Sequence, residues 1–314
     1  VVNEVLTHTD PLPGDAIELY NPSTDAAAVG DWWLTDDFGT PQKYRIPAGT
    51  TLPAGGFVVF YQSNSFGLGA NAFALSSQGD DAYLFSGNAA GELTGYVHGF
   101  DFGPQFAHAT FGRHVISTGE DHFPSQASPT LDLPNAGPLV GPVVIGEVHY
   151  HPLDIAYPGG TADNTGDEYI ELHNLSDVPV PLFDEANPTN TWRLRDAVDF
   201  AFPQGATLPA NSFALVVSFE PSDAALSNRF ATAVGLPAGV PLFGPFSGKL
   251  DNSRDSVELT RPDAPHLPPE PDAGFVPQVL ADKVKYTDST PWDAGADGCG
   301  PSLQRIAESA YGND

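Results

Sequence analysis

Oxygen-bearing side chains gather in two loops of the second half of the chain, and their chemistry suits a hard cation. The six candidate ligands, three in each loop, are Asp163, Asp167, Glu168, Asp251, Asn252 and Asp255. Carboxylate and amide oxygens in turns are the ligands that calcium accepts, although neither loop has the EF-hand spacing. Calcium is therefore the one cofactor that the sequence predicts. The alternative interpretation is a solvated acidic surface, because the chain holds 40 Asp and Glu residues.

A second group with metal-binding chemistry lies in the stretch GEVHYHP, where Glu147, His149 and His151 alternate. Residues two apart share one face of a strand, and two histidines with a carboxylate are typical of zinc sites. A metal-dependent hydrolase is one hypothesis that follows, and a solvated strand face is the alternative. The sequence has no G-x-S-x-G motif, no phosphate-binding glycine loop and no C-x-x-C motif. We therefore expect no enzyme activity.

These residues belong to a sequence that repeats itself. DAIELYNPSTDAAAVG, at residues 15–30, matches DEYIELHNLSDVPVPL, at residues 167–182. Further matches in the same order are Glu4 with Glu147, DWWLTD with TWRLRD, IPAGTTLPAGG with FPQGATLPANS, DDAYLFSG with RDSVELTR, and TFGRH with SLQRI. We therefore expect two copies of one domain. The first copy spans residues 1–137 and the second, with longer loops, spans 143–314, joined by a proline-bounded linker at 138–142.

The repeated polar residues suggest structural roles. Glu18 and Glu171 lie between apolar neighbours, where a carboxylate can accept hydrogen bonds from the backbone amides of a crossing loop. A catalytic role would need a second acid or base at a fixed distance, and the sequence shows none. Asn21 and Asn174 each follow a strand and precede a turn, and we expect them to stabilise chain corners.

Three tryptophans accompany the repeat. Trp33 and Trp192 are aligned in the strand that follows, and we expect both rings to lie in a core, where an indole buries a large area. On this alignment Trp32 is an additional ring of the first copy. An exposed Trp32 could stack on a sugar, which is the basis of a polysaccharide-binding alternative.

The pattern of each copy is that of an all-β protein. Residues alternate with period two in short runs, and the runs are separated by Asn, Pro, Gly and Asp turn residues. Short strands at this spacing predict two tandem immunoglobulin-like antiparallel β-sandwich domains. We expect one helix, within residues 220–234, in a loop of the second copy.

Composition limits the partners. The formal net charge is −28, which opposes binding to nucleic acid and to anionic lipid. No apolar run is long enough to insert into a membrane, and the single cysteine, Cys299, excludes a disulfide within the chain. Because the chain has no methionine, we expect it to be a processed piece of a longer, secreted precursor.

The ordered motifs resemble the lamin tail domain. The residues that carry the resemblance are V-x-x-E-V, IELYN or IELHN, W-x-L, IPAGTTLPAGG, and FGR or SLQR. The resemblance implies an immunoglobulin-like sandwich of a kind also common in secreted bacterial proteins. It also implies a closing segment, which SPTLDLPN at residues 128–135 fits in the first copy. We expect the second copy to lack this segment and to leave an edge strand open.

Three functions follow as expectations. The first is a non-catalytic structural or adhesive module at a bacterial surface, with other copies of itself or cell-surface components as partners, able to assemble head to tail into fibres. The second is a ligand- or polysaccharide-binding appendage of a larger secreted enzyme. The third is the metal-dependent hydrolase. All three place the protein outside the cell.

Overall fold

The computed structural model describes residues 1–7, 14–268 and 273–314. The chain divides into two compact units, Val1–Leu139 and Val140–Asp314. Each unit has its own hydrophobic core, and each is described separately below. The point of division lies within the linker region proposed from the sequence.

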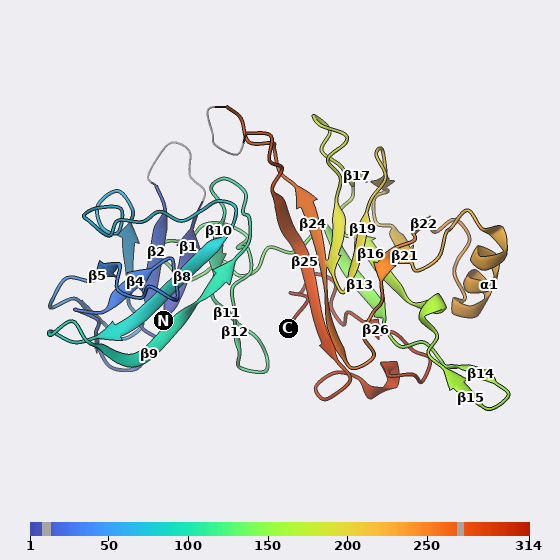
Figure 1. Cartoon of the computed structure of the whole chain (residues 1–314), viewed down its shortest axis with the longest axis horizontal. Helices are drawn as coiled ribbons and strands as arrows, with labels where there is room; N and C mark the ends of the chain where they lie inside the picture. Colours follow the sequence, from blue (N-terminus) through green and yellow to red (C-terminus); the bar gives the residue numbers. More distant parts are fainter. Residues whose placement is uncertain (8–13, 269–272) are drawn as a thin grey trace. The chain divides into compact units, whose positions relative to one another are not determined.

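Two sheets of the first unit, with the strand orders β10-β1-β2-β7 and β5-β4-β8-β9, form a sandwich (Figure 1). The remaining strands form two short pairs, β3 with β6 and β11 with β12. The strands of the first unit are β1 (Val2–Leu6), β2 (Ala16–Tyr20), β3 (Ala27–Ala28), β4 (Trp33–Thr35), β5 (Tyr44–Arg45), β6 (Thr51–Leu52), β7 (Phe57–Tyr61), β8 (Asp80–Gly87), β9 (Leu93–Phe102), β10 (Thr110–Gly112), β11 (His114–Val115) and β12 (Asp121–His122).

Period-two alternation explains how the core of the first unit is filled. In β8, Ala82 and Leu84 are fully buried while their neighbours are partly exposed, so one face of the strand packs on the opposite sheet. In β1 every residue is buried, which means that this strand is covered on both faces. The second cover is the segment at residues 128–135, described below.

The second unit repeats this arrangement with additions. Its sheets have the orders β22-β21-β16-β13-β26 and β23-β19-β18-β24-β25. The order β26-β13-β16-β21 corresponds to β10-β1-β2-β7, and β19-β18-β24-β25 corresponds to β5-β4-β8-β9. The strands are β13 (Val143–His149), β14 (Ile155–Tyr157), β15 (Gly160–Ala162), β16 (Tyr169–Asn174), β17 (Val180–Pro181), β18 (Arg193–Asp196), β19 (Val198–Ala201), β20 (Thr207–Leu208), β21 (Phe213–Val217), β22 (Leu242–Phe243), β23 (Ser247–Gly248), β24 (Arg254–Pro262), β25 (Gln278–Thr287) and β26 (Leu303–Gln304).

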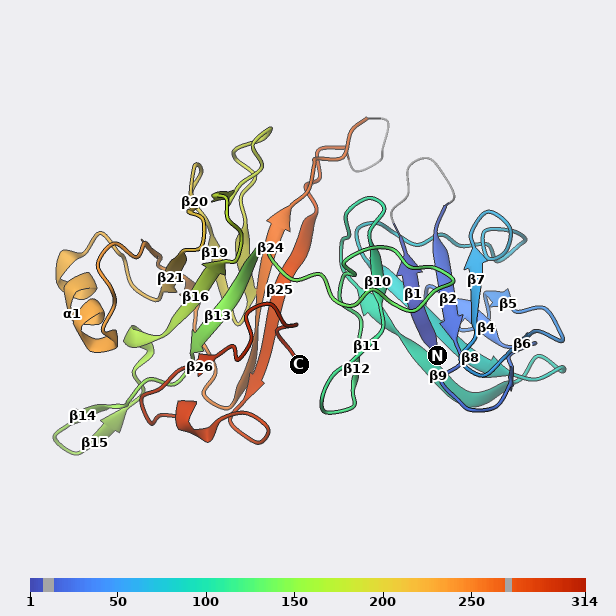
Figure 2. The same ribbon diagram turned by 180° about the vertical axis from the view of Figure 1, so that it is seen from behind.

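The predicted helix is confirmed as α1 (Ala224–Val234), which lies beyond β21 and β22 in both views (Figures 1 and 2). Asp223 begins the helix because its side chain accepts hydrogen bonds from two free backbone N–H groups. Gly235 ends it in the left-handed conformation, with φ of 66°. Phe230 is fully buried against Tyr169 and Phe219, so the helix is held by its aromatic face.

The predicted fold class is confirmed, since both units are sandwiches of mainly antiparallel sheets. The pairing of β21 with β22 is parallel. The additions to the second unit are the hairpin β14–β15, helix α1, the short strands β22 and β23, and two 3₁₀ turns, η1 (Thr165–Asp167) and η2 (Ala294–Ala296). These additions account for the longer loops that the sequence indicated.

Candidate functional site

A β-bulge places two glutamates opposite each other on neighbouring strands of the first unit. The register of β1 against β2 shifts at Asn3, and Glu4 then lies opposite Glu18. Both glutamates have 0% exposure. Because a buried carboxylate is costly without hydrogen-bond donors, the partners of this pair identify what the site is built to hold.

The donors come from residues 128–135, which we call the closing segment. Thr130 donates its backbone N–H to Glu4 Oε1 at 2.8 Å and its hydroxyl to Glu4 Oε2 at 2.7 Å. The backbone N–H of Asp132 donates to Glu18 Oε2. Each buried carboxylate therefore holds the backbone of a segment more than one hundred residues away in the sequence.

The bulge residue completes this attachment. Asn3 donates from Nδ2 to Glu18 Oε1 and to Asn135 Oδ1, both at 2.7 Å. Asn135 in turn donates from Nδ2 to the carbonyl oxygen of Arg113 at 2.9 Å. Glu18 and the closing segment were predicted from the sequence, but Asn3 was not, because a bulge leaves no distinct local signal in a strand.

The electrostatics of the pair reflect its burial. Burial raises the pKa of Glu18 to about 7, and the charges of Glu4 and Asp132 act in the same direction. The hydrogen bonds from the Asp132 N–H and from Asn3 favour the charged form but do not outweigh burial. Glu18 is therefore a carboxyl group whose protonation changes near neutral pH.

The second unit has the same strand register, but its paired glutamates have different hydrogen-bond partners. Its β-bulge falls at Gly146, and Glu147 lies opposite Glu171. Glu147 Oε1 accepts hydrogen bonds from the hydroxyls of Tyr169 and Ser302. Glu171 accepts no hydrogen bond from any described residue, and both glutamates are only partly buried. The acceptors of the first unit are thus repeated without the donors of a closing segment.

Glu171 has unfavourable surroundings for a carboxylate. Burial raises its pKa to about 7, and the negative charges of Glu147 and Glu308 raise it further. Gly146 stands where the first unit has Asn3, so the side-chain amide that binds Glu18 has no counterpart. A donor arriving at Glu171 would offset part of this cost.

The two corner asparagines make the same hydrogen bonds in both units. Asn21 Oδ1 accepts from the N–H and hydroxyl of Ser23, and Asn174 Oδ1 accepts from the same groups of Ser176. The Nδ2 groups each donate to three backbone carbonyls, those of Asp25, Leu52 and Pro53 in the first unit and of Val178, Leu208 and Pro209 in the second. Each asparagine therefore ties its own turn to the turn that precedes β7 or β21.

The alignment of Trp33 with Trp192 is wrong by one residue. The carbonyl of Trp32 accepts from the N–H of Ile46 at 2.8 Å, and that of Trp192 accepts from Phe202 at 3.0 Å, in the same position of each unit. Trp192 is buried in its core, and Trp32 packs against the core of the first unit. Consecutive strand residues face opposite sides, so Trp33 faces away from the side that Trp32 covers.

The true counterpart of Trp33 is Arg193, which holds the equivalent place in β18. The guanidinium of Arg45 lies over the Trp33 ring at 5.7 Å from its centroid, and Trp32 contacts Tyr96 at 5.6 Å. Both indoles are thus engaged by side chains of their own unit. Trp32 is partly buried against the core, whereas the polysaccharide alternative was based on an exposed Trp32.

The two acidic loops are brought together by Asp163, Asn252 and Glu168. Asn252 Nδ2 donates to Asp163 Oδ1 at 3.1 Å, and Glu168 Oε2 accepts from the N–H of Leu250 at 3.0 Å. Glu168 is 0% exposed, and burial raises its pKa to about 7. These contacts join the loop before β16 to the loop before β24.

The other predicted calcium ligands have partners within the protein. Asp167 forms an ion pair with Arg229 at 2.7 Å. Asp251 Oδ1 accepts from the N–H of Ser253 at 2.8 Å, and Asp255 Oδ2 accepts from the N–H of Asp251 at 3.2 Å. These carboxylates shape their own loops, and calcium binding by the six residues stays a prediction.

The predicted zinc arrangement of Glu147, His149 and His151 is not assembled. Strand β13 ends at His149, so His151 leaves the face that the alternation assigned to it. Among the described residues, the one group of three acidic or histidine side chains able to reach a common ion is His151, Asp154 and Asp163, whose ligand atoms lie within 4.8 Å of one another. Asp154 was missed by the sequence analysis, although it follows His151 by three residues.

His149 and His151 have different environments. His149 is buried with its ring edge-to-face on Tyr169, and burial lowers its pKa. His151 Nδ1 lies 2.6 Å from Asp297 Oδ1. An acidic cluster of this kind is common without an ion, and it contains no nucleophile poised beside a base.

The class defined by the strand order, the two-sheet core and the corners is an immunoglobulin-like β-sandwich. Within that class, residues 1–99 match the family model of the Lamin Tail Domain. Searches of curated proteins and of solved structures gave no match. In the described part of the chain, no helix combines the length and apolar character needed to cross a membrane.

Proposed function

We propose that this protein is a non-catalytic structural module with two lamin-tail-like domains in tandem, working outside the cell as a spacer or adhesive element. The observation that carries the proposal is the set of hydrogen bonds made by the repeated polar residues. Glu4, Glu18 and Asn21 direct their hydrogen bonds to backbone and to the closing segment. These side chains stabilise the fold by holding its corner and its closing segment.

The second unit is included because its architecture repeats the first. Its β-bulge, its glutamate register and its corner hydrogen bonds correspond one by one to those of the first unit. These three features are formed by the residues that carry the resemblance to the lamin tail domain. They support a second lamin-tail-like domain beyond the residues that the family model matches.

The extracellular placement is supported by charge and composition. A net charge of −28 keeps the chain soluble and repels nucleic acid. It also favours divalent cations at the surface, in keeping with the calcium site predicted from the acidic loops. A protease added to intact producing cells should therefore remove the protein, and complete protection from that protease would contradict the placement.

The non-catalytic role has its own test. The purified chain would be assayed on ester, phosphodiester and peptide substrates with added zinc, magnesium or calcium, beside a His151→Ala variant. We expect no metal-dependent turnover above background in either protein. Turnover by the wild-type chain that is lost in His151→Ala would establish the hydrolase alternative instead.

A further inference from the structure

The outer face of the sheet β5-β4-β8-β9 carries a group of partly exposed rings. In β8, Ala82 and Leu84 point into the core. Tyr83 and Phe85 alternate with them and therefore lie on the solvent side of the sheet. Phe38 is 54% exposed, and its ring centroid lies 5.1 Å from that of Tyr83 and 5.5 Å from that of Phe85. We call these three rings the aromatic face.

Two aspartates border the aromatic face. Asp81 of β8 lies directly opposite Asp101 of β9, one position along the same side of the sheet from Tyr83. Burial raises the pKa of Tyr83, and the negative charges of the two aspartates raise it further, so both carboxylates act on this ring. Like charges directly opposite each other destabilise a sheet. Among the described residues, neither aspartate has an ion-pair partner.

The lysines and arginines of the first unit already have carboxylate partners. They are Lys43, Arg45 and Arg113, and they pair with Asp36, Asp31 and Asp121 respectively. A cation that neutralises Asp81 and Asp101 must therefore come from outside this unit.

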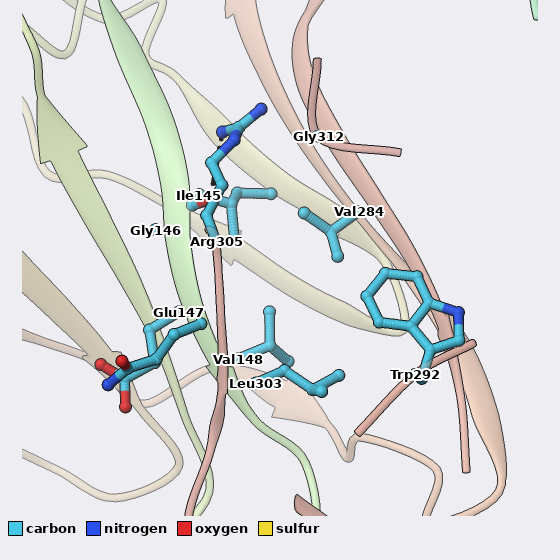
Figure 3. Close-up of a pocket in the computed structure, with 10 residues that line it drawn as sticks. Ile145, Gly146, Glu147, Val148, Val284, Trp292, Leu303, Arg305 and Gly312 are labelled. Carbon is cyan, nitrogen blue, oxygen red and sulfur yellow. Dashed lines mark hydrogen bonds between the residues drawn. The ribbon is translucent and has the colours of Figure 1, made fainter. Parts of the chain in front are cut away.

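The second unit holds a buried carboxylate with an arginine of its own. Figure 3 shows Arg305 among the side chains that line a pocket beside β13 and β25. Its guanidinium binds both carboxylate oxygens of Asp282, at 2.7 and 3.1 Å. This pocket therefore belongs to the fold of its own unit.

The register of the two units allows their outer sheet faces to be compared. Leu84 lies opposite Leu34, and Leu259 lies opposite Leu194. Leu34 and Leu194 are equivalent because each follows the equivalent tryptophan by two residues. Leu84 and Leu259 are therefore equivalent as well, and the positions before them in β8 and β24 correspond one by one.

On this register the outer face of the second unit is balanced in charge. The positions of the two facing aspartates hold Ser256 and Lys285, which lie opposite each other. The next pair on the same side, Glu258 and Lys283, forms an ion pair at 2.8 Å. The second unit thus places its own lysines beside the acids of this face, whereas the first unit has two carboxylates and a tyrosine at the corresponding positions.

Arg45 shows how the first unit binds a cation on this side of the sheet. Its guanidinium lies 5.7 Å from the centroid of the Trp33 ring and pairs with Asp31 at 2.9 Å. A ring and a carboxylate suit the planar guanidinium, which stacks and donates hydrogen bonds at the same time. Phe85, directly opposite Trp33, belongs to the aromatic face, so the same two components recur one strand further on.

We propose that the aromatic face, with Asp81 and Asp101, binds an arginine-bearing segment of a partner protein. The guanidinium stacks on the exposed rings and donates hydrogen bonds to the two carboxylates. The proposal gives the adhesive role argued above a partner of stated chemistry, and it rests on that role.

The extent and charge of the face favour a polypeptide as the occupant. The row formed by Trp33, Phe85 and Val97 crosses three strands, about 10 Å, which leaves room for apolar neighbours of the arginine. Val97 is 41% exposed at the end of this row. A neutral sugar could stack on the rings but would leave the facing carboxylates without a counter-charge.

The test uses the full chain and a short fluorescent peptide of alternating arginine and leucine, with binding followed by anisotropy at low salt. A second peptide carries citrulline in place of arginine, which keeps the shape and removes the charge. We expect saturable binding of the arginine peptide and about tenfold weaker binding of the citrulline peptide. Phe38→Ala should weaken binding of the arginine peptide about threefold, because it removes one cation–π contact.

The double variant Asp81→Asn with Asp101→Asn should also bind the arginine peptide about tenfold more weakly. Asparagine at position 81 still accepts the N–H of Phe38, so the unfolding temperature should not fall. The matched control is Asp25→Asn with Glu185→Gln, which removes the same charge from two exposed positions and should bind as the wild type does.

Two results would overturn the proposal. Equal weakening in the double aspartate variant and in its control would mean that the net charge of −28 attracts the peptide without a defined site. Equal binding of the two peptides would mean that the face recognises apolar surface and not a cation. Both results concern affinity, so they are distinct from the turnover and the protease protection that would overturn the proposed function.

Other occupants are outcomes of the same experiments. Displacement of the peptide by cellohexaose would assign the face to a neutral glycan and overturn the proposal. Sedimentation velocity without peptide should show a monomer. A concentration-dependent dimer that is lost in the double aspartate variant would assign the face to a second copy of this chain in place of a separate partner.

Discussion

Glu18 and Glu171 occupy the same register position of equivalent strands, yet in the described part of the chain a crossing segment binds Glu18 and not Glu171. The consequence for the first unit can be tested at Thr130, whose hydroxyl donates to Glu4. We expect Thr130→Val to lower the free energy of unfolding by about 1–3 kcal/mol, since it leaves a buried carboxylate oxygen without that donor. Denaturant titration measures the loss, with the exposed Thr118→Val as control. Equal stability of the two variants would show that the closing segment is not held through this contact.

The corner asparagines give a prediction for both units. Asn21→Ala and Asn174→Ala each remove a side chain that makes five hydrogen bonds, most of them to backbone carbonyls. We expect each substitution to lower the free energy of unfolding by about 2–4 kcal/mol, as for a broken buried network. Asn71→Ala, at an exposed position, is the control. A loss below about 0.5 kcal/mol at either corner would contradict the role assigned to it.

The corrected alignment predicts that the fold tolerates substitution of Trp33 better than substitution of Trp32. Trp32→Ala should lower the free energy of unfolding by about 3 kcal/mol because it removes a ring packed on the core. Trp33→Arg, which reproduces the residue found in the second unit, should cost less than about 1 kcal/mol. Thermal or chemical unfolding of the two variants distinguishes them. A larger loss of unfolding free energy in Trp33→Arg than in Trp32→Ala would instead support the alignment of Trp33 with Trp192.

Stability should depend on pH through Glu168. Its pKa is raised from 4.5 to about 7, so its contribution to stability is complete below pH 4.5 and is lost as the pH rises through 7. His98 and His149 act in the opposite sense, because their lowered pKa values cost stability as the pH falls below 6.5. The difference between Glu168→Gln and the wild type isolates the carboxyl group.

We expect the variant to gain on the order of 3 kcal/mol relative to the wild type between pH 5 and pH 8, which corresponds to the shift of Glu168. Unfolding curves at several pH values in that window measure the change. Glu185→Gln, on an exposed loop, should show no such trend. A constant difference between Glu168→Gln and the wild type would mean that Glu168 titrates normally in the fold.

Calcium gives the last prediction. If the acidic loops bind the ion, calcium at one hundred times its dissociation constant should stabilise the native state by about 2.7 kcal/mol, and a chelator should reverse the gain. Asp163→Asn should abolish most of this stabilisation, since Asp163 contacts both loops and lies near His151 and Asp154. Asp199→Asn is the control. An unfolding temperature that is the same in calcium and in excess chelator would remove calcium from the function.

The fold was largely predictable from local patterns. Period-two alternation, turn residues and a repeat in six matched segments indicated the strands, the sandwich and the helix near Phe230. The Asn corners were predictable for the same reason, because an Asn side chain mimics a turn formed by its own neighbours. Each of these features depends on residues close together in the sequence.

What the sequence alone determined is therefore the set of strands, the repeated corners and the presence of buried glutamates. The tertiary structure decided the remainder. The strand register, in which Trp33 pairs with Arg45 and Leu34 with Tyr44, showed that Trp32, and not Trp33, covers the core. Only the crossing of residues 128–135 showed that Glu18 has donors, and only the folded second unit showed that Glu171 accepts no hydrogen bond from the described residues. The physical reason is that strand register and hydrogen-bond satisfaction depend on segments distant in sequence, whose approach no local pattern encodes.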